Sequence, residues 1–270
     1  MTTPQVPPRP AALITGGSGG IGLELARCLA RDHHELVIVA RREAGLAAAA
    51  AELRAAGAAG VTTVPADLAR PAEVERLLAT LHASAIDIGI LVNNAGFGTA
   101  GAFARTPLDD ELAMIQTNVA ALTHLTKRVL PAMLRRRSGR ILNVASTAAF
   151  QPGPFMAVYY ATKAYVLSFS QALAEELRDT GVTATALCPG PTTTSFAARA
   201  GMEETRLFAR NISMSATAVA KAGYAGMMRG DRIVVPGAGN KLVAQASRLA
   251  PRALVTRISR RLNEGRSRPD

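Results

Sequence analysis

The sequence has little cysteine, with only Cys28 and Cys188 among its 270 residues. Two thiols are too few to staple a small secreted fold, so a disulfide scaffold is excluded, and we interpret both as reduced core thiols of a cytoplasmic protein. No block of like charge dominates and 49% of the residues are apolar, which excludes wholesale disorder. The chain is long enough for one α/β domain with a sizeable core.

A long hydrophobic run is also missing. The opening MTTPQVPPRP has three prolines before residue 9 and no apolar stretch. The longest uncharged run, residues 141–162, has 22 residues, but proline, glycine and polar residues interrupt it. A helix that spans a bilayer needs roughly 20 predominantly apolar residues. We therefore expect neither a secretory signal nor a transmembrane helix.

Lysine is scarce, with four lysines against 27 arginines, and the formal net charge is +11. A genome rich in G and C produces such a bias without functional selection. From residue 199 onward, however, there are 14 basic and 5 acidic residues, so most of the excess charge lies in the last quarter. No aromatic residues that could stack on bases lie among the arginines, and the sequence has no known nucleic-acid-binding motif. We therefore expect no nucleic-acid partner.

Short β-branched runs alternate with longer helical patterns, which is typical of βαβ units around a parallel sheet. Expected strands are residues 11–15, 35–40, 61–65, 86–93, 139–145, 182–188 and 232–235. Expected helices are residues 21–31, 43–56, 71–84, 107–137, 157–180 and 217–229. This order predicts an α/β fold with a doubly wound, seven-stranded, mainly parallel sheet and helices on both faces. Ligands of such sheets bind beyond the carboxyl ends of the strands.

Residues 15–22 read TGGSGGIG, directly after the first expected strand and at the start of the first expected helix. Two registers are open, one using Gly17, Gly19 and Gly22, the other using Gly16, Gly20 and Gly22. In either register, glycines let backbone N–H groups approach a pyrophosphate that the positive end of the helix favours. The predicted cofactor contacts in this loop are Gly16, Ser18, Gly20, Ile21 and Gly22.

The end of the second expected strand indicates which dinucleotide binds. An acidic residue there would bond the ribose 2′-OH of NAD, whereas arginine accommodates the 2′-phosphate of NADP. The strand ends in Ala40-Arg41-Arg42, without a carboxylate before Glu43. Because guanidinium groups bind phosphate in a bidentate fork, Arg41 and Arg42 predict NADP(H) in preference to NAD(H).

Tyr159 and Lys163 are spaced i and i+4, which places a phenol and an ammonium on one helix face. A free phenol has a pKa near 10 and is a poor acid at neutral pH, but a nearby cation lowers that value. Tyr165 is close in the sequence, but Phe169 occupies its i+4 position, so it lacks the cation. Tyr159 is therefore the candidate general acid.

Further motifs follow in chain order: Asp67-Leu68 after the third expected strand, Asn93-Asn94-Ala95-Gly96 after the fourth, Asn118, Ser146, and Pro189-Gly190 with Thr192 and Thr194. With the glycine loop and the Tyr159–Lys163 pair, they make residues 11–236 resemble the single-domain short-chain dehydrogenase/reductases, in a bacterial, NADP-preferring branch. The resemblance implies a Rossmann fold. It also implies a homodimer or homotetramer.

On the cofactor side, the resemblance implies contacts of Asp67 and Leu68 with adenine, of Asn94 and Gly96 near the ribose, and of Pro189, Gly190, Thr192 and Thr194 with the nicotinamide carboxamide. On the catalytic side, it implies that Ser146 and Tyr159 hydrogen-bond the substrate oxygen. Lys163 would lower the pKa of Tyr159 and bond the nicotinamide ribose, and Asn118 would hold a water that returns the proton. Tyr160 is bulkier than the Ser or Ala common in the family at that position, which leaves the shape of the substrate pocket open.

The expected substrate is a small hydrophobic ketone or alcohol. Substrate specificity in this family lies after Pro189-Gly190, here in residues 193–215, with help from residues 97–103 and 150–158. The apolar side chains of these segments are Phe97, Phe150, Phe155, Met156, Phe196, Met202, Leu207, Phe208, Ile212 and Met214. A catalytically silent NADP(H) sensor or scaffold on the same fold is the alternative, although a sensor has no need of Ser146, Tyr159 and Lys163.

Beyond a short N-terminal segment (residues 1–10) and the domain (11–236), residues 237–270 form a basic extension. Residues 241–249 and 251–262 predict two short helices. In the second, Leu254, Ile258 and Leu262, joined by Val255, predict one apolar stripe with arginines mostly off it. We expect this helix to pack on its own domain or on a second copy. Weak peripheral binding to a membrane is the other hypothesis.

Overall fold

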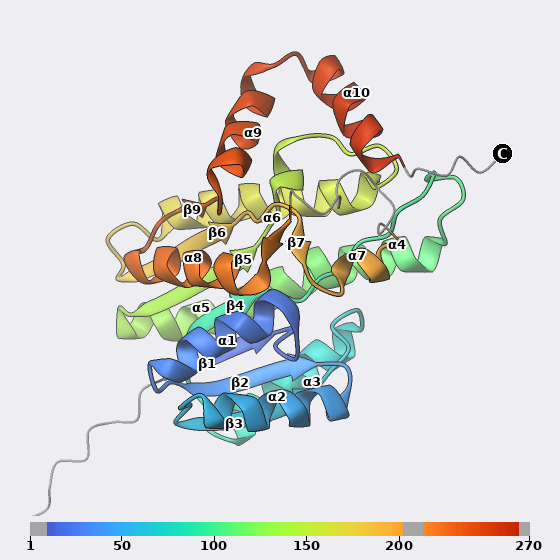
Figure 1. The fold of residues 1–270 in the computed structure, drawn as a ribbon. Coiled ribbons are helices and arrows are strands. Elements are labelled where there is room, and N and C mark those ends of the chain that lie inside the picture. The colour runs from blue at the N-terminus through green and yellow to red at the C-terminus, as the bar shows by residue number, and fades with distance from the viewer. Residues whose placement is uncertain (1–9, 202–212, 265–270) are drawn as a thin grey trace, which may run out of the picture.

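The computed structural model describes residues 10–201 and 213–264, and Figure 1 shows their arrangement. Seven strands form one parallel sheet in the order β3-β2-β1-β4-β5-β6-β9. Their bounds are β1 (Ala11–Thr15), β2 (Glu35–Ala40), β3 (Gly60–Pro65), β4 (Ile88–Asn93), β5 (Gly139–Val144), β6 (Val182–Leu187) and β9 (Ile233–Val234). The strand order reverses direction between β1 and β4, so the predicted doubly wound sheet is confirmed.

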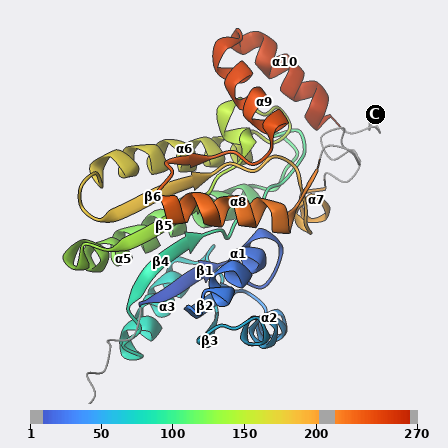
Figure 2. The same ribbon diagram turned by 60° about the vertical axis from the view of Figure 1, so that its left-hand side comes forward.

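Helices cover both faces of this sheet (Figures 1 and 2). One layer holds α1 (Gly20–Arg31), α2 (Glu43–Ala55) and α8 (Ala216–Arg229), and the other holds α3 (Pro71–Ala83), α5 (Leu122–Arg136) and α6 (Ala157–Glu176). Strand side chains alternate between the layers: in β1, Leu13 packs with the α3–α5–α6 layer and Ile14 with the α1–α2–α8 layer, both fully buried. Because helices cover both faces of the sheet, most residues of its strands are apolar.

The long helix expected at residues 107–137 is interrupted in the structure. It consists of α4 (Leu108–Ile115), a π-helical segment η1 (Gln116–Ala121) and α5, in direct succession. A π-helical turn carries one extra residue and is often found at functional sites. Hydrophobic periodicity does not show such a turn, so it was not predicted. Asn118 lies within it.

Four short elements also went unpredicted. They are the 3-10 helix η2 (Thr147–Phe150), the paired strands β7 (Thr192–Thr193) and β8 (Met214–Ser215), and α7 (Phe196–Arg199). Elements of two to four residues are too short for a period of 2 or 3.6 to become visible. Apart from these, the expected elements agree with the observed ones within a few residues at each end.

The extension beyond β9 folds into α9 (Ala238–Leu249) and α10 (Arg252–Asn263), which form a hairpin at the β9 edge of the sheet (Figures 1 and 2). The predicted apolar stripe on the second helix faces the domain only through Val255, and packing of the rest on a second copy stays a prediction. Val255, Ser259 and Asn263 are buried, whereas the side chains of Leu254 and Ile258 are 51% and 50% exposed. No helix among the described residues is long and apolar enough to cross a bilayer.

Candidate active site

The glycine loop between β1 and α1 has a backbone that side chains would not tolerate. Gly16 and Gly20 have φ angles of +65° and +56°. A Cβ on Gly22 would lie 2.4 Å from both Gly16 O and Asn94 Nδ2, so that position accepts only glycine without a shift. A Cβ on Gly19, by contrast, would have no atom of another residue within 4 Å apart from its chain neighbours. The loop is a tight cradle whose outer side is open at the first turn of α1.

Thr15 and Asn94 tie this cradle to the end of β4. Thr15 Oγ1 accepts hydrogen bonds from the backbone N–H groups of Asn94 and Ala95, each at 3.0 Å. Asn94 Nδ2 donates to the carbonyls of Thr15 at 2.9 Å and Gly16 at 3.2 Å. Asn94 therefore holds the loop in shape, beside the ribose contact that the resemblance implies for it. Thr15 begins the predicted glycine loop but was not predicted as a site residue.

The end of β2 lies beside the same loop. The Gly17 N–H donates to Val39 O at 3.2 Å. A Cβ on Gly45 in α2 would lie 3.7 Å from Ser18 Cβ. Arg41 and Arg42 follow β2 and are exposed. Within residues 10–201 and 213–264, neither guanidinium is engaged in an ion pair. Two arginines thus remain accessible at the strand end where the sequence placed a 2′-phosphate.

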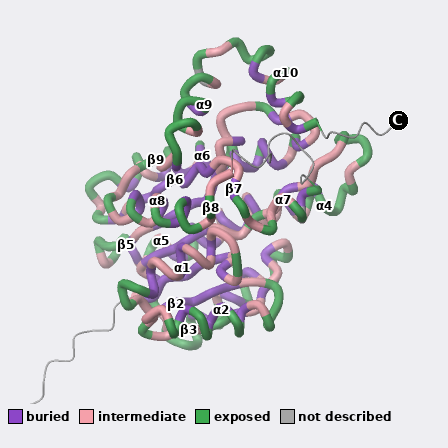
Figure 3. Tube along the Cα trace, in the orientation of Figure 1, coloured by how far each residue is buried: buried purple, intermediate pink, exposed green. Residues whose placement is uncertain are grey.

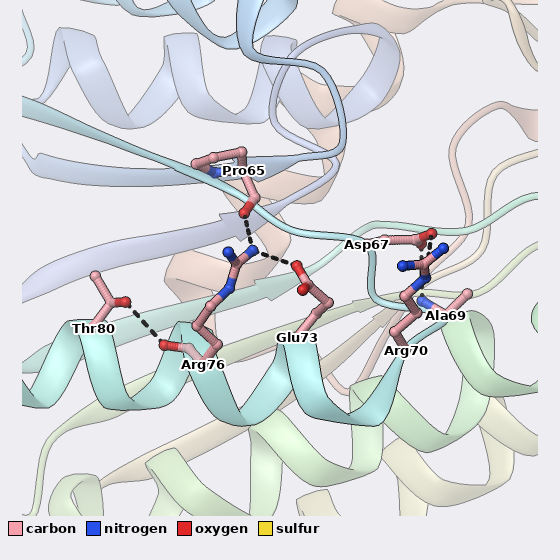
Figure 4. Close-up of polar contacts among 7 residues, drawn as sticks. All are labelled: Pro65, Asp67, Ala69, Arg70, Glu73, Arg76 and Thr80. Atoms are coloured by element: carbon pink, nitrogen blue, oxygen red, sulfur yellow. Dashed lines mark hydrogen bonds and ion pairs between the residues drawn. The ribbon is translucent and has the colours of Figure 1, made fainter.

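Asp67 and Leu68 follow β3, and Figure 4 shows the surroundings of Asp67. Asp67 Oδ1 accepts from Ala69 N at 3.2 Å, and its other oxygen lies 3.9 Å from Arg70 Nε. Leu68 is 5% exposed. Asp67 thus closes a turn at the start of α3, and its carboxylate remains partly accessible, as an adenine contact requires.

The π-helical turn places Asn118 against the chain that follows β4. Its Oδ1 accepts from Phe97 N at 3.1 Å, and its Nδ2 donates to Phe97 O at 3.0 Å and to Thr162 Oγ1 at 3.1 Å. A Cβ on Gly96 would lie 2.9 Å from Asn118 Oδ1 and 3.5 Å from Lys163 Nζ. Asn118, Gly96 and Lys163 are therefore brought together. Thr162, next to Lys163, supports this group, and no signal in the sequence singled it out.

Ser146 and Tyr159 meet at the carboxyl end of β5. Ser146 caps η2, where its Oγ accepts from Ala148 N at 3.1 Å and donates to Pro189 O at 3.5 Å. The Tyr159 side chain is buried, with its ring centroid 5.3 Å from that of Phe196. Burial raises the pKa of Tyr159 well above its ordinary value, and the polar contact with Ser146 opposes that shift.

Lys163 lies one helical turn beyond Tyr159, and its Nζ is 5.8 Å from the centroid of the Tyr159 ring. Nζ donates to Val144 O at 2.8 Å, at the end of β5. Burial lowers the pKa of Lys163 to about 8. In the structure, desolvation of the phenol is the dominant influence on the Tyr159 pKa and the ammonium donates to a backbone carbonyl. That Lys163 lowers the pKa of Tyr159 during catalysis stays a prediction.

The segment after β6 returns to the glycine loop. Thr192 Oγ1 donates to Gly190 O at 2.9 Å, and Pro189 O accepts from Thr147 N at 2.8 Å. A Cβ on Gly20 would lie 3.3 Å from the Thr194 methyl group. The predicted nicotinamide segment therefore lies between the catalytic group and the first turn of α1.

The predicted apolar lining is only partly assembled. Phe97, Met156 and Phe196 belong to one cluster with Tyr159, and a Cβ on Gly98 would lie about 3 Å from Tyr159, Met156 and Phe196. Phe150 packs in a different cluster, Met214 packs with the α1–α2–α8 layer, and the Phe155 ring contacts Arg260. These three side chains therefore do not belong to the cluster around Tyr159. Met202, Leu207, Phe208 and Ile212 lie outside the described residues, as does nearly all of the N-terminal segment 1–10.

The bulky Tyr160 anchors the C-terminal extension. Its hydroxyl donates to Asn263 Oδ1 at 3.1 Å, and Asn263 Nδ2 donates to Pro154 O at 3.0 Å. A Cβ on Gly153 would lie 2.2 Å from the Tyr160 ring, so glycine is required where the loop crosses it. At the other helix, a Cβ on Gly190 would lie 2.3 Å from Asn240 of α9. The residue that departs from the family pattern thus binds α10 to the catalytic helix α6, and Asn263 in turn binds the loop before that helix.

Replacing Asn263 by Ala is expected to loosen α10 without unfolding the domain. The change removes the hydrogen bonds of Asn263 with the buried Tyr160 hydroxyl and the Pro154 carbonyl, at a cost of about 1–3 kcal/mol. Hydrogen–deuterium exchange should become faster in residues 252–263 and 151–156 and stay unchanged in β1 and β4. Unchanged exchange in α10 would show that this contact does not hold the helix.

The residues present fit a dinucleotide. The cradle is open at Gly19, no acidic residue lies in the first turn of α1, and Arg41 and Arg42 lie at the adjacent strand end. Gly16, Ser18, Gly20, Ile21 and Gly22 would hold the pyrophosphate. The catalytic group lies further along the same edge, at the ends of β4, β5 and β6.

Comparison with known proteins agrees with this geometry. The chain is 41% identical over 191 residues to a putative ketoacyl reductase of Streptomyces coelicolor, covering 69% of this chain and 72% of that protein. It is 36% identical over 178 residues to the ketoacyl reductase HetN of a Nostoc species, covering 66% of this chain but only 62% of that relative, less than two thirds of its length.

Among solved structures, a short-chain dehydrogenase from Sphingobium yanoikuyae in complex with NADPH superimposes with a TM-score of 0.79 at 35% identity, covering 89% of this chain and 94% of that one. A family model described as short chain dehydrogenase matches residues 10–205. Since this match includes the glycine loop, the Tyr159–Lys163 pair and all the other predicted site residues, the chain belongs to the short chain dehydrogenase family of oxidoreductases.

Proposed function

We propose that this oxidoreductase reduces the carbonyl group of a small hydrophobic substrate with NADPH, and that Tyr159 is the general acid. The observation that carries the proposal is the polar contact between Ser146 and Tyr159 at the end of β5, with Lys163 and Asn118 beside it. A protein that only senses or scaffolds has no use for a buried phenol next to a hydroxyl and an ammonium.

The two hydroxyls act on the substrate oxygen. Ser146 and Tyr159 donate hydrogen bonds to the carbonyl oxygen and stabilise the negative charge that develops there. When bound, NADPH would supply the hydride. As the carbon is reduced, the Tyr159 O–H bond breaks and its proton passes to the substrate oxygen, which gives the alcohol. The Lys163 ammonium then stabilises the phenolate until a proton returns.

Burial of Tyr159 suits the role of a general acid. A general acid must be protonated before the step, and the raised pKa of Tyr159 keeps the phenol protonated at neutral pH. Tyr159 is therefore in the form that can donate a proton to a ketone oxygen.

The pH dependence of reduction is expected to follow Lys163. Because burial lowers its pKa to about 8, the ammonium is charged below that pH and neutral above it. Above pH 8, kcat/KM for reduction should therefore fall about tenfold per pH unit, since the neutral amine no longer stabilises the phenolate. The Tyr160→Phe variant should give the same profile. A flat profile between about pH 7 and 9 would contradict this role for Lys163.

Two features support a ketone on an apolar chain as the substrate. Phe97, Met156 and Phe196 surround the Tyr159 ring with apolar surface. Two of the relatives are named ketoacyl reductases. The homo-oligomer and the cytoplasmic location expected from the sequence stay predictions.

A panel of ketones tests the proposal by following NADPH consumption at saturating cofactor. It should include 3-oxoacyl thioesters, bulky cyclic ketones, ketoacids and keto sugars, each also assayed with NADH. We expect turnover of apolar ketones, faster with NADPH. Tight NADPH binding without turnover of any panel member would instead favour the silent sensor.

A further inference from the structure

The two C-terminal helices turn their large aliphatic side chains away from the domain. The buried residues are Ala244 in α9 and Val255, Ser259 and Asn263 in α10, of which only Val255 is a larger aliphatic residue. The residues that face solvent are Leu242, Val243 and Leu249 in α9, 71%, 52% and 88% exposed, and Leu254 and Ile258 in α10. A helix that served only to cover its own domain would bury its leucines and expose its serine and asparagine. We call these five exposed aliphatic residues the outer face.

Basic side chains accompany the outer face. In α10, Arg257 and Arg261 lie three and seven positions after Leu254, which places them on the same side of the helix as Leu254 and Ile258. Both arginines are exposed, as are Arg252 and Lys241. Residues 238–264 contain six basic residues and one acidic residue, Glu264. Aliphatic and basic groups are therefore interleaved on the exposed side of α10.

A hollow next to this surface also has the chemistry of an anion site. It lies between α10 and the loop before α6, and its walls are Pro154, Phe155, Thr256, Arg257 and Arg260. The Arg260 guanidinium lies 5.5 Å from the centroid of the Phe155 ring, which holds it at the rim. Guanidinium groups gathered around a hollow are suited to phosphate oxygens.

The hairpin is held firmly but projects from the body of the protein. The bend between α9 and α10 lies at the outermost point of this end of the molecule in both views (Figures 1 and 2). Most of α9 and α10 is coloured as exposed in Figure 3. Because Tyr160 and Asn263 fasten α10 and Gly190 packs against Asn240 of α9, the outer face is presented by folded helices.

We propose that the outer face binds the surface of an anionic lipid bilayer, with the aliphatic side chains at the level of the acyl chains and the arginines at the phosphates. Interleaved aliphatic and basic residues on a surface helix match the two layers of a bilayer interface. A second copy of the same face is a poorer partner, because it would bring Arg257 and Arg261 against their own like charges. The proposal is independent of the reaction that the enzyme catalyses.

Binding of the full-length protein to vesicles tests this. Vesicles of phosphatidylglycerol mixed with phosphatidylcholine, and vesicles of phosphatidylcholine alone, are sedimented with the protein at about 20 and 150 mM salt. We expect binding to the anionic vesicles that weakens with salt. In the double variant Arg257→Gln/Arg261→Gln, each lost charge should lower the partition coefficient about fivefold at low salt.

A matched pair of variants tests the aliphatic part. Leu254→Ser/Ile258→Ser changes two exposed residues spaced i and i+4 on α10, and should lower the partition coefficient at least about tenfold. Leu108→Ser/Leu112→Ser makes the same changes at the same spacing on α4, where the side chains are 68% and 53% exposed, and should leave binding unchanged. All four residues are exposed, so folding is preserved, which circular dichroism verifies.

Three results would overturn the proposal. The first is no sedimentation of the native protein with anionic vesicles at low salt. The second is equal loss of binding in the α4 and α10 pairs. The third is a change of molar mass in light scattering on substitution of Leu254 and Ile258, without vesicle binding by the native protein, which would assign the outer face to contacts between copies of the chain.

Discussion

Replacing Tyr159 by Phe is expected to lower kcat for ketone reduction by about 10²–10⁴-fold, the range that general acid catalysis contributes. The aromatic ring keeps its contacts with Phe196 and Tyr160, because only the hydroxyl that meets Ser146 is removed. The affinity for NADPH should therefore stay near that of the native enzyme. Stopped-flow single turnover at saturating NADPH measures the loss, and quenching of cofactor fluorescence measures the affinity.

Tyr160→Phe is the matched control for this variant. The Tyr160 hydroxyl is bonded to Asn263 and belongs to the anchor of α10, so its removal should change kcat much less than the removal of the Tyr159 hydroxyl. If Tyr159→Phe keeps more than half of the native activity, Tyr159 is not the acid. A larger loss in Tyr160→Phe would assign that role to its neighbour.

Replacing Arg41 by Ala is expected to narrow the preference for NADPH over NADH by about 10- to 150-fold, mainly through KM for NADPH. The loss of one hydrogen bond to a charged phosphate costs about 1.5–3 kcal/mol, and each 1.4 kcal/mol is a factor of ten. NADH lacks the 2′-phosphate, so its KM should change little. Arg41 is exposed and follows β2, so the substitution removes no core packing.

Arg70→Ala provides the control for charge alone. Arg70 is also an exposed arginine, at the neighbouring strand end beside Asp67, where the sequence predicts adenine rather than the 2′-phosphate. Its removal should shift KM for the two cofactors equally. An enzyme that prefers NADH before any substitution would contradict the assignment of Arg41 and Arg42.

The strands and helices that have a continuous hydrophobic pattern could be predicted from the sequence. Strands β1 and β2 and helix α2 begin where they were expected, because burial on both sheet faces imposes apolar runs and an amphipathic helix needs a stripe. Doubly wound topology followed from the alternation of these elements, since right-handed crossovers leave few alternatives. The order of the motifs then placed the site at the carboxyl ends of the strands.

Helix α10 shows what the hydrophobic pattern did not determine. Leu254, Ile258 and Leu262 form an apolar stripe at helical spacing, and the sequence predicted that this helix packs on its own domain or on a second copy. In the structure, Tyr160 and Pro154 offer a hydrogen-bonding surface, so Asn263 faces the domain together with Val255 and Ser259, and Leu254 and Ile258 are left outside. Hydrophobic periodicity identifies a helix but contains no information about the chemistry of the surface it meets.

By itself, the sequence determined the sheet, the glycine loop and the identity of the candidate catalytic residues, because these depend on local pattern, spacing and residue type. Only the tertiary structure decided which partners those residues meet. It turned the Lys163 ammonium toward Val144, buried Tyr159 so that its pKa rises, and inserted the π-helical turn that brings Asn118 to Phe97. These outcomes depend on distance and desolvation between segments far apart in the chain, which no local pattern encodes.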